Sequence, residues 1–309
     1  MSFDSSPSGR QIGTAFILTA CGGLLFTFDL PLLRLSMADQ WTMVFVRGLL
    51  LFATLSLGWL VARMMGDRSP YLAGAAGIAV AFTSTIGNIS YIGAVVHAPA
   101  ANVVFLIALT PVIAASLSHL MLGEKVHAYT WSATILALCG AALITSQGID
   151  SGHWVGDALA ITSAFCSATI LTIIRATGRK VATSLALGSL ASSMIALTVF
   201  GIVPSSLIGT GAFDLPSLLW LGLNGLIVMP LATVLLARGP RLLPSADVSM
   251  FFMLETILTP IWTWMLFAEV PSPRVLLGGL LLIVTLLAHS WWRLAVSLRA
   301  SPPVPAQCA

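Results

Sequence analysis

The sequence predicts an all-α membrane protein with ten transmembrane helices, arranged as two inverted five-helix repeats with both termini cytoplasmic. Three observations lead to this fold class. The 309 residues are 58% hydrophobic and only 8% charged, whereas soluble domains are about 45–50% apolar and about 25% charged. Long apolar stretches follow one another along the chain, and positive charge gathers in alternate gaps between them. The two halves of the chain also resemble each other.

The apolar stretches are each roughly 20 residues long, enough for a helix to cross about 30 Å of hydrocarbon. No stretch alternates as a strand would, and every backbone polar group in lipid must bond internally, so helices are the expected spanning elements. We place the ten stretches near residues 12–33, 42–62, 71–95, 99–122, 128–146, 154–174, 181–203, 216–237, 245–268 and 274–292.

The distribution of positive charge supports this placement of the spans independently, because cytoplasmic loops of membrane proteins are enriched in Lys and Arg. Of the 14 Lys and Arg residues, only Arg34 and Arg274 fall on the predicted outer side, and Arg47 lies within a stretch. The others fall on the side of the two termini: Arg10, Arg63, Arg68, Lys125, Arg175, Arg179, Lys180, Arg238, Arg241, Arg293 and Arg299. Both termini are therefore expected in the cytoplasm.

An internal repeat organises the chain. Residues Pro99–Leu122 have a counterpart 145 residues later, at Ser245–Phe267. The aligned pairs are Ala101 and Ala246, Val103 and Val248, Leu109 and Leu254, and Glu124 and Glu269, with Asn102 opposite Asp247. Five helices per half is an odd number, so the halves must cross the membrane in opposite directions. Inverted repeats are typical of secondary transporters, whose substrate site lies near the midplane between the repeats.

This reading divides the chain into four segments. We expect a disordered N-terminus at residues 1–11 and a first five-helix repeat at 12–147. The second, inverted repeat covers 154–293, and a disordered cytoplasmic tail covers 294–309.

Other classes of protein are disfavoured. The chain contains no HExxH, GxSxG or CxxC motif, and its gaps are too short for a soluble active site, so we do not expect an enzyme. The cysteines at positions 21, 139, 166 and 308 fit no metal spacing, and no metal or cofactor is expected. The net charge of +3 is not gathered with exposed aromatics, so no nucleic-acid partner is expected.

A set of short motifs is shared with a known family. The motifs are Tyr91, Ala98–Ala101, Leu109-x-Pro111, Gly123-Glu124, Leu254-Glu255 and Ala268-Glu269. From about residue 12 to 292 the chain thus resembles the EamA-type group of the drug/metabolite transporter superfamily. The resemblance implies ten helices in two inverted repeats and export of small metabolites such as amino acids. The family's Leu-Glu-Pro is replaced here, because Thr256 follows Glu255 and the proline is Pro260, so any break in the ninth helix is expected one turn later.

The predicted function is secondary transport, with export of amino acids or related zwitterions and amines by alternating access around a midplane cavity. The expected partners are a small-molecule substrate and the lipid bilayer of a bacterial cytoplasmic membrane. Protons are a candidate coupling ion, and the protein is expected to be a monomer or a homodimer. Efflux of lipophilic cations by a multidrug transporter is the alternative, and it requires a larger apolar cavity. A membrane-embedded enzyme is less favoured.

Two ionisable residues inside the predicted spans are the leading substrate-binding candidates, because such residues cost at least about 2.5–3.5 kcal/mol at a helix centre. Glu255 lies about 15 Å from the cytoplasmic end of its span, and Arg47 about 8 Å from the outer end. Glu255 is predicted to bind an ammonium group or a proton, and Arg47 to hold a carboxylate or to close an outer gate. The structural alternative is that they pair with each other or with backbone carbonyls.

Neutral side chains at membrane depth complete the predicted binding set. They are Asn88, Tyr91, Asn102 and Asn224, with Phe105 and Phe252 as apolar walls. Interhelical hydrogen bonds of such groups contribute about 0.6 kcal/mol on average, so structural roles stay open for them, as core packing does for the phenylalanines.

Gating is assigned to an acidic residue and three prolines. Asp29 lies near the outer end of the first span, where it can reach water or Arg34. The prolines are Pro31, Pro111 and Pro260, in the first, fourth and ninth spans. Proline frees a carbonyl within a helix, so these positions are either hinges for alternating access or packing kinks.

Overall fold

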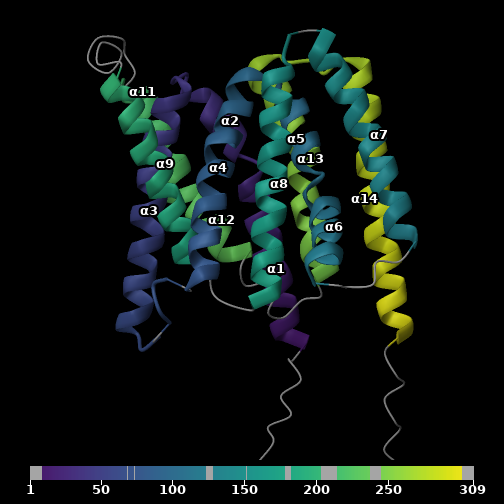
Figure 1. The fold of residues 1–309 in the computed structure, drawn as a ribbon, viewed down its shortest axis with the longest axis horizontal. Helices are drawn as coiled ribbons and strands as arrows, with labels where there is room; N and C mark the ends of the chain where they lie inside the picture. Colours follow the sequence, from purple (N-terminus) through teal and green to yellow (C-terminus); the bar gives the residue numbers. More distant parts are fainter. Residues whose placement is uncertain are drawn as a thin grey trace, which may run out of the picture.

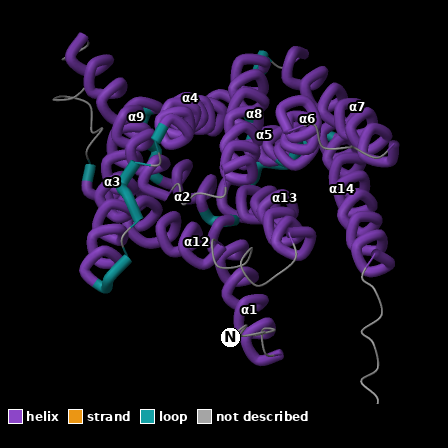
Figure 2. The backbone as a smooth tube through the Cα atoms, turned by 60° about the horizontal axis from the view of Figure 1, so that its bottom comes forward, coloured by secondary structure: helices purple, strands orange, loops and turns teal. Residues whose placement is uncertain are grey.

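The computed structural model describes residues 9–67, 69–72, 74–122, 128–150, 152–177, 182–202, 214–236 and 245–300, which form a helical bundle (Figures 1 and 2). Its helices are α1 (Gly9–Phe26), α2 (Asp29–Leu35), α3 (Gln40–Met64), α4 (Ala75–His97), α5 (Ala100–Ile107), α6 (Thr110–Leu122), α7 (Ala128–Asp150), α8 (Trp154–Thr177), α9 (Ala182–Ile202), α11 (Leu215–Gly222), the π-helix η1 (Leu223–Val228), α12 (Met229–Leu236), α13 (Ser245–Phe267) and α14 (Pro273–Ala300).

Apolar helices long enough to cross a membrane confirm the multi-pass class. Within the described residues, six segments have this length and composition: Gln40–Met64, Ala75–His97, Ala100–Met121, Trp154–Ile174, Ala182–Val199 and Leu215–Leu235. Two shorter apolar helices cover Ile135–Ser146 and Pro273–Thr285. Each predicted span coincides with one helix or with consecutive helical segments.

Helix covers part of both predicted terminal segments, because α1 begins at Gly9 and α14 continues to Ala300. Residues 1–8 and 301–309 lie outside the described part, as does Glu124, the repeat partner of Glu269. The first residue of α1 and the last of α14 lie at the same end of the bundle, the lower end in Figure 1.

Proline explains two interruptions in the predicted spans. Residues 27–28 separate α1 from α2, and Pro31 has no N–H to donate to the carbonyl of Thr27. The Thr259 hydroxyl of α13 donates to that carbonyl instead, at 3.1 Å. Residues 108–109 separate α5 from α6, and Pro111 leaves the Ile107 carbonyl to the Thr110 hydroxyl, at 2.7 Å.

The eighth and ninth spans behave differently from each other. In the eighth, η1 interrupts the α-helix just before Pro230, and π-helical turns often mark functional sites. In the ninth, α13 continues from Ser245 to Phe267 with Pro260 inside it. The break predicted one turn after the family's usual position is therefore absent from the described helix.

Small residues allow the helices of the two halves to pack closely, as is usual in membranes. Gly48 of α3 lies so near α9 that a Cβ atom there would be 2.4 Å from the Ser193 hydroxyl. In the same way, Gly140 of α7 and Gly278 of α14 face each other. A Cβ atom added to either glycine would lie within 3 Å of the carbonyl oxygen of the other. The helix pairs α3 with α9 and α7 with α14 form the two flanks of the bundle in Figure 1.

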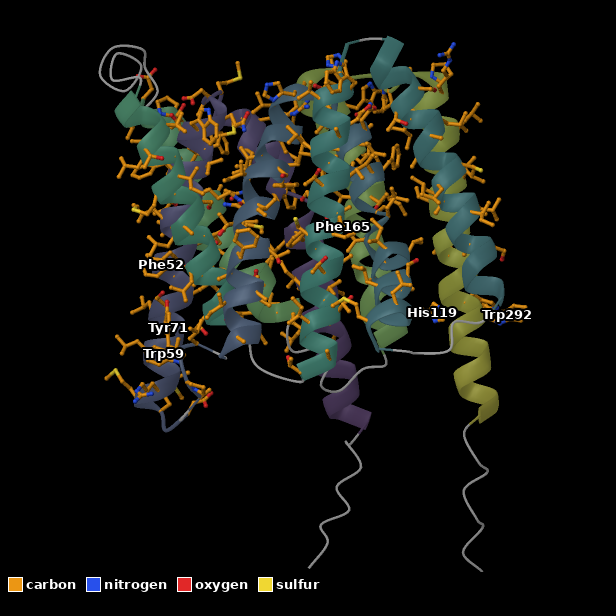
Figure 3. All side chains as sticks on the ribbon, in the orientation of Figure 1. Phe52, Trp59, Tyr71, His119, Phe165 and Trp292 are labelled. Carbon is orange, nitrogen blue, oxygen red and sulfur yellow. The ribbon has the colours of Figure 1, made fainter. Side chains whose placement is uncertain are left out.

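Aromatic side chains mark the periphery of the bundle (Figure 3). Near the lower end of α3, the rings of Trp59 and Tyr71 meet edge to face at 4.9 Å, and the Arg63 guanidinium lies 5.2 Å from the Trp59 ring. Phe165 and Trp292 are exposed. Such exposed apolar side chains suit a surface that faces lipid, with Trp near the interface.

Candidate functional site

A buried ion pair lies where the first span is interrupted. Asp29 begins α2, and the Arg47 Nη2 of α3 donates to its Oδ2 and Oδ1 at 2.9 and 3.2 Å. The two side chains are only 1% and 5% exposed. Arg47 therefore pairs with Asp29 rather than with Glu255, and Asp29 does not pair with Arg34.

Asparagines from two further spans complete the coordination of this pair. Arg47 donates through Nη1 to Asn88 Oδ1 at 2.6 Å and through Nε to Asn224 Oδ1 at 3.2 Å. Asn224 Nδ2 donates to Asp29 Oδ1 at 2.7 Å, and Asn88 Nδ2 donates to the Ser192 hydroxyl at 2.8 Å. We call Asp29, Arg47, Asn88, Ser192 and Asn224 the polar cluster. All three guanidinium nitrogens are bonded, as a charged group in lipid requires.

The interruptions in the helices position this cluster. Asn224 lies within η1, whose widened turn brings its side chain to Asp29. Asp29 is the first residue after the break at 27–28. Interrupted helices that present polar groups in the bundle interior are typical of transporter binding sites.

Tyr91 of α4 lies against the polar cluster. The centroid of its ring is 5.3 Å from Arg47 Cζ, a cation–π distance. Its hydroxyl is buried and interacts electrostatically with Asp29, Arg47 and Glu255; Asp29 is near enough for a weak hydrogen bond, but the hydroxyl makes no well-formed hydrogen bond to the described residues. A buried hydroxyl without a partner costs about 1–3 kcal/mol, so this group is available to a ligand.

Glu255 of α13 is the remaining ionisable side chain beside the cluster. It is 8% exposed and interacts electrostatically with Asp29 and Arg47. Within the described residues its carboxylate makes no hydrogen bond or ion pair. Asp29 and Arg47 neutralise each other, so an ionised Glu255 gives the site an uncompensated negative charge. That charge calls for a proton or a bound cation.

The structure thus brings Asp29, Arg47, Asn88, Tyr91, Asn224 and Glu255 together, whereas Asn102 and Phe105 make their contacts elsewhere. Asn102 donates from Nδ2 to Asp157 Oδ1 of α8 at 3.0 Å. Phe105 packs on α14, where a Cβ on Gly279 would be 2.4 Å from its ring. Phe252 belongs to α13, but its side chain lies outside the described part.

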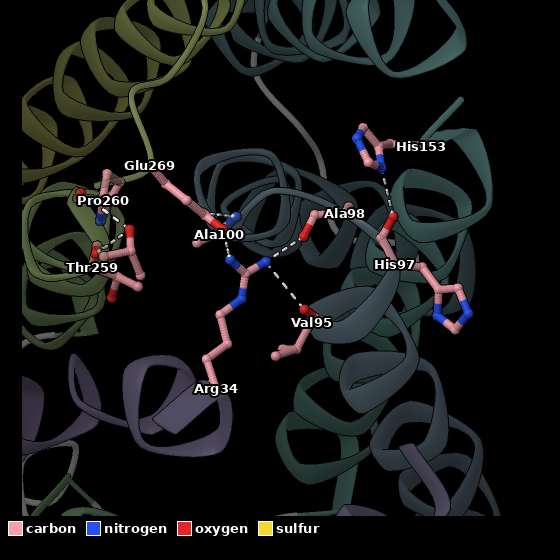
Figure 4. Close-up of polar contacts among 10 residues, drawn as sticks. Arg34, Val95, His97, Ala98, Ala100, His153, Thr259, Pro260 and Glu269 are labelled. Carbon is pink, nitrogen blue, oxygen red and sulfur yellow. Dashed lines mark hydrogen bonds and ion pairs between the residues drawn. The ribbon is translucent and has the colours of Figure 1, made fainter. Parts of the chain in front are cut away.

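A second ion pair closes one end of the bundle (Figure 4). Arg34, in the last turn of α2, pairs with Glu269, which follows α13. Arg34 also donates to the carbonyls of Val95, at 3.1 Å, and Ala98, and the Ala100 N–H donates to Glu269 Oε2 at 3.2 Å. We call Arg34 and Glu269 the end latch, because this pair joins the ends of α2, α4, α5 and α13.

Sequence reasoning missed three participants. Glu269 is singled out in the sequence only as a repeat position and part of a family motif, although an acid just after a span is a natural partner for Arg34 at the same end. Asp157 is ionisable and lies three residues into a predicted span, so the cost of burying charge could have identified it. Ser192 carries no comparable signal, because serines are common in the small-residue helix α9.

A multi-pass helical bundle with a buried, interhelical polar site has the architecture of a membrane transporter. Residues 12–146 match the model of the EamA-like transporter family. This match confirms, over the first half of the chain, the resemblance to the EamA-type transporters of the drug/metabolite transporter superfamily that was seen in the sequence.

Solved structures share the fold. Among 21 matching chains is a protein described only as "Crystal structure of protein". Its TM-score is 0.58 at 17% sequence identity, over 88% of this chain and 96% of that chain. At that identity the likeness concerns the fold alone. No curated protein matches the chain.

Proposed function

We propose that the chain is a secondary transporter that exports small amine-bearing metabolites, amino acids or related zwitterions and amines, across a bacterial cytoplasmic membrane. The observation that carries the proposal is the buried carboxylate of Glu255, which has no ion-pair partner among the described residues and lies beside a neutral Asp29–Arg47 pair. An ammonium group would neutralise it. A proton could do the same when the site is empty, which makes proton exchange a natural coupling.

Contacts between the halves support alternating access of two inverted repeats. Counting interrupted spans once, α3, α5 and α7 pack on α9, α13 and α14, so the second, fourth and fifth spans meet their own counterparts. The third span meets the sixth (α4 with α8), and the first meets the eighth (α1 with α12). If the two halves are exchanged, each of the first three contacts maps onto itself, and the last two map onto each other. A two-fold relation between the repeats requires this pattern.

The bonding of Arg47 sets the expected order of substrates. Its nitrogens are held by Asp29, Asn88 and Asn224, so a substrate carboxylate gains little from it. Among the described side chains of the site, Glu255 and the Tyr91 hydroxyl are the groups that a substrate can engage. We therefore expect the amine to be required for recognition and the carboxylate to be tolerated.

Counterflow into proteoliposomes tests this function with matched compounds. The panel contains a labelled amino acid, the amine that results from its decarboxylation, and the acid that lacks its amino group. Saturable uptake of the first two but not of the third is the expected result. Uptake of the acid alone, or of none of the three, would contradict the proposal. Uptake confined to a lipophilic quaternary cation would favour multidrug efflux.

Tyr91→Phe tests the unpaired hydroxyl. Loss of one hydrogen bond of about 1 kcal/mol to a bound amine should raise the half-saturation concentration about 5-fold. Thermal stability should change little, because the hydroxyl makes no well-formed hydrogen bond to the described residues in the empty site. The matched control is Tyr71→Phe, whose hydroxyl lies 2.7 Å from the Ser56 hydroxyl, and which should leave half-saturation unchanged. Equal effects of the two substitutions would argue against a role for Tyr91 in binding.

The end latch gives a test of gating. In a variant whose native cysteines are replaced by serine, we introduce Ala101→Cys, at a buried position just inside the latch. Arg34→Glu alone, or Glu269→Arg alone, places like charges together and should speed thiol labelling about 10-fold. The double exchange restores opposite charges and should slow labelling again. Fast labelling in the double variant would show that the pair does not hold this end closed.

A further inference from the structure

A shallow cavity of about 500 Å³, largely open along one side, lies between the last turns of α7 and the first turns of α8. Thr145 of α7 lines it, together with Trp154, Asp157, Ala158 and Ile161 of α8. The four α8 residues follow the i, i+3, i+4, i+7 spacing of one helix face. Trp154 is 59% exposed and Ile161 37%. This helix face therefore points away from the bundle, and the cavity opens toward lipid.

The wall of this otherwise apolar cavity contains a carboxylate that is only partly satisfied. Asp157 is 2% exposed, and its Oδ1 accepts the 3.0 Å hydrogen bond from the neutral amide of Asn102. Its Oδ2 is buried and has no hydrogen-bond partner among the residues that the structure describes. His153 acts on Asp157 electrostatically, but its Nδ1 lies 3.1 Å from the His97 carbonyl (Figure 4). A location in the first turn of α8 suits a negative charge, yet it does not supply a partner for Oδ2.

The depth of Asp157 indicates the kind of ligand. Trp154 begins α8, and exposed tryptophans usually lie at the level of the lipid headgroups. Asp157 is about 4.5 Å further along the helix axis, near the boundary between headgroups and hydrocarbon. Ala158 and Ile161 continue the wall toward the hydrocarbon. A cation that also carries an apolar chain fits both parts of this surface.

We propose that this cavity binds an amphiphile with a protonated primary amine, which donates to Asp157 Oδ2 while its apolar chain lies along Ala158 and Ile161. A primary ammonium has N–H donors for the free oxygen and supplies the positive charge that Asn102 lacks. An ethanolamine lipid headgroup and a free alkylamine present the same chemistry. The site uses other residues than the transport site around Glu255 and does not depend on the proposed substrate.

Native mass spectrometry of the purified full-length chain tests the site. The probes are phosphatidylethanolamine, phosphatidylcholine of identical acyl chains, and a long-chain alkylamine. Choline carries its charge without an N–H donor, so the two lipids separate hydrogen-bonded recognition from charge alone. We expect the ethanolamine lipid to bind about 10-fold more tightly than the choline lipid. Preference for the alkylamine instead would support the site and identify a soluble amine as its ligand.

Three variants distinguish binding from folding. Asp157→Asn should remove the preference for a primary amine, while Asp214→Asn should keep it, since Asp214 is an exposed cap residue whose side chain makes no capping bond. Ala158→Phe fills the cavity from its exposed rim and should also remove the preference without changing any charge. Equal binding of all three probes by the wild type, or an unchanged preference in both Asp157→Asn and Ala158→Phe, would overturn the proposal.

Discussion

Arg47→Met is expected to lower the free energy of unfolding by about 3–5 kcal/mol, because it leaves the Asp29 carboxylate buried without its cation. Three further side chains would also lose or rearrange their hydrogen bonds, since Arg47 holds Asn88 and Asn224, and Asn88 extends the network to Ser192. Denaturation in mixed micelles, followed by a change in tryptophan fluorescence or by loss of a monodisperse chromatographic peak, measures the change.

A double substitution identifies the cause of this loss. Arg47→Met combined with Asp29→Leu removes both charges, and replacing a buried pair by apolar residues is often neutral, so most of the stability should return. Arg63→Met is the matched control, because that guanidinium is exposed and lies over Trp59 at the end of α3. It should change stability by less than about 0.5 kcal/mol. If the double variant is no more stable than Arg47→Met, the unpaired charge of Asp29 is not the cause of the lost stability.

Glu255→Gln is expected to reduce counterflow of an amine-bearing substrate about 30-fold or more. Removing one partner of a buried charge pair costs about 2–5 kcal/mol, and glutamine keeps the shape of glutamate without its charge. The folded state should survive, because the Glu255 carboxylate makes no ion pair with the described residues. Initial rates of uptake at several substrate concentrations, with thermal stability of the same preparation, measure the two effects separately.

Asp214→Asn is the control for this experiment, since it removes a carboxylate from an exposed position at the start of α11. Its uptake should equal that of the wild type. If uptake survives Glu255→Gln, then Glu255 is structural and the search for the binding group moves to Tyr91 and Asn88. If instead Glu255→Gln fails to fold, the carboxylate contributes to packing in a way that its missing partners do not reveal.

The spans were predictable because the cost of exposing polar backbone to lipid leaves a long apolar signal in the sequence. The partner of Arg47 was not predicted, although the sequence contains a clue. Asp29 and Arg47 are equally distant from position 38, in the turn between α2 and α3. A helical hairpin brings such residues to the same depth. Drawing the first span to end at residue 33 placed Asp29 about one turn from its outer end instead, whereas α2 continues to Leu35.

Pairings between distant spans could not be read in the same way. Asn102 and Asp157 meet because α5 packs on α8, and Asn224 reaches Asp29 only because η1 widens its turn. Hydropathy reports the depth of a residue but not the azimuth at which its helix faces a neighbour. Phe105 illustrates this limit, since its depth suited a cavity wall and its direction leads to Gly279.

The Thr259 hydroxyl donates the hydrogen bond to the Thr27 carbonyl that Pro31, without an N–H, cannot donate. Thr259 lies four residues after Glu255, on the same face of α13, and it holds the Thr27 carbonyl, while Trp262 donates to the Thr27 hydroxyl at 3.1 Å. The residue expected to bind the ligand and the residues that hydrogen-bond to the interrupted first span thus lie on one continuous helix, α13. A ligand that shifts α13 must change the energy of the hydrogen bonds to Thr27. By reciprocity, the conformation of the first span must change the affinity for the ligand.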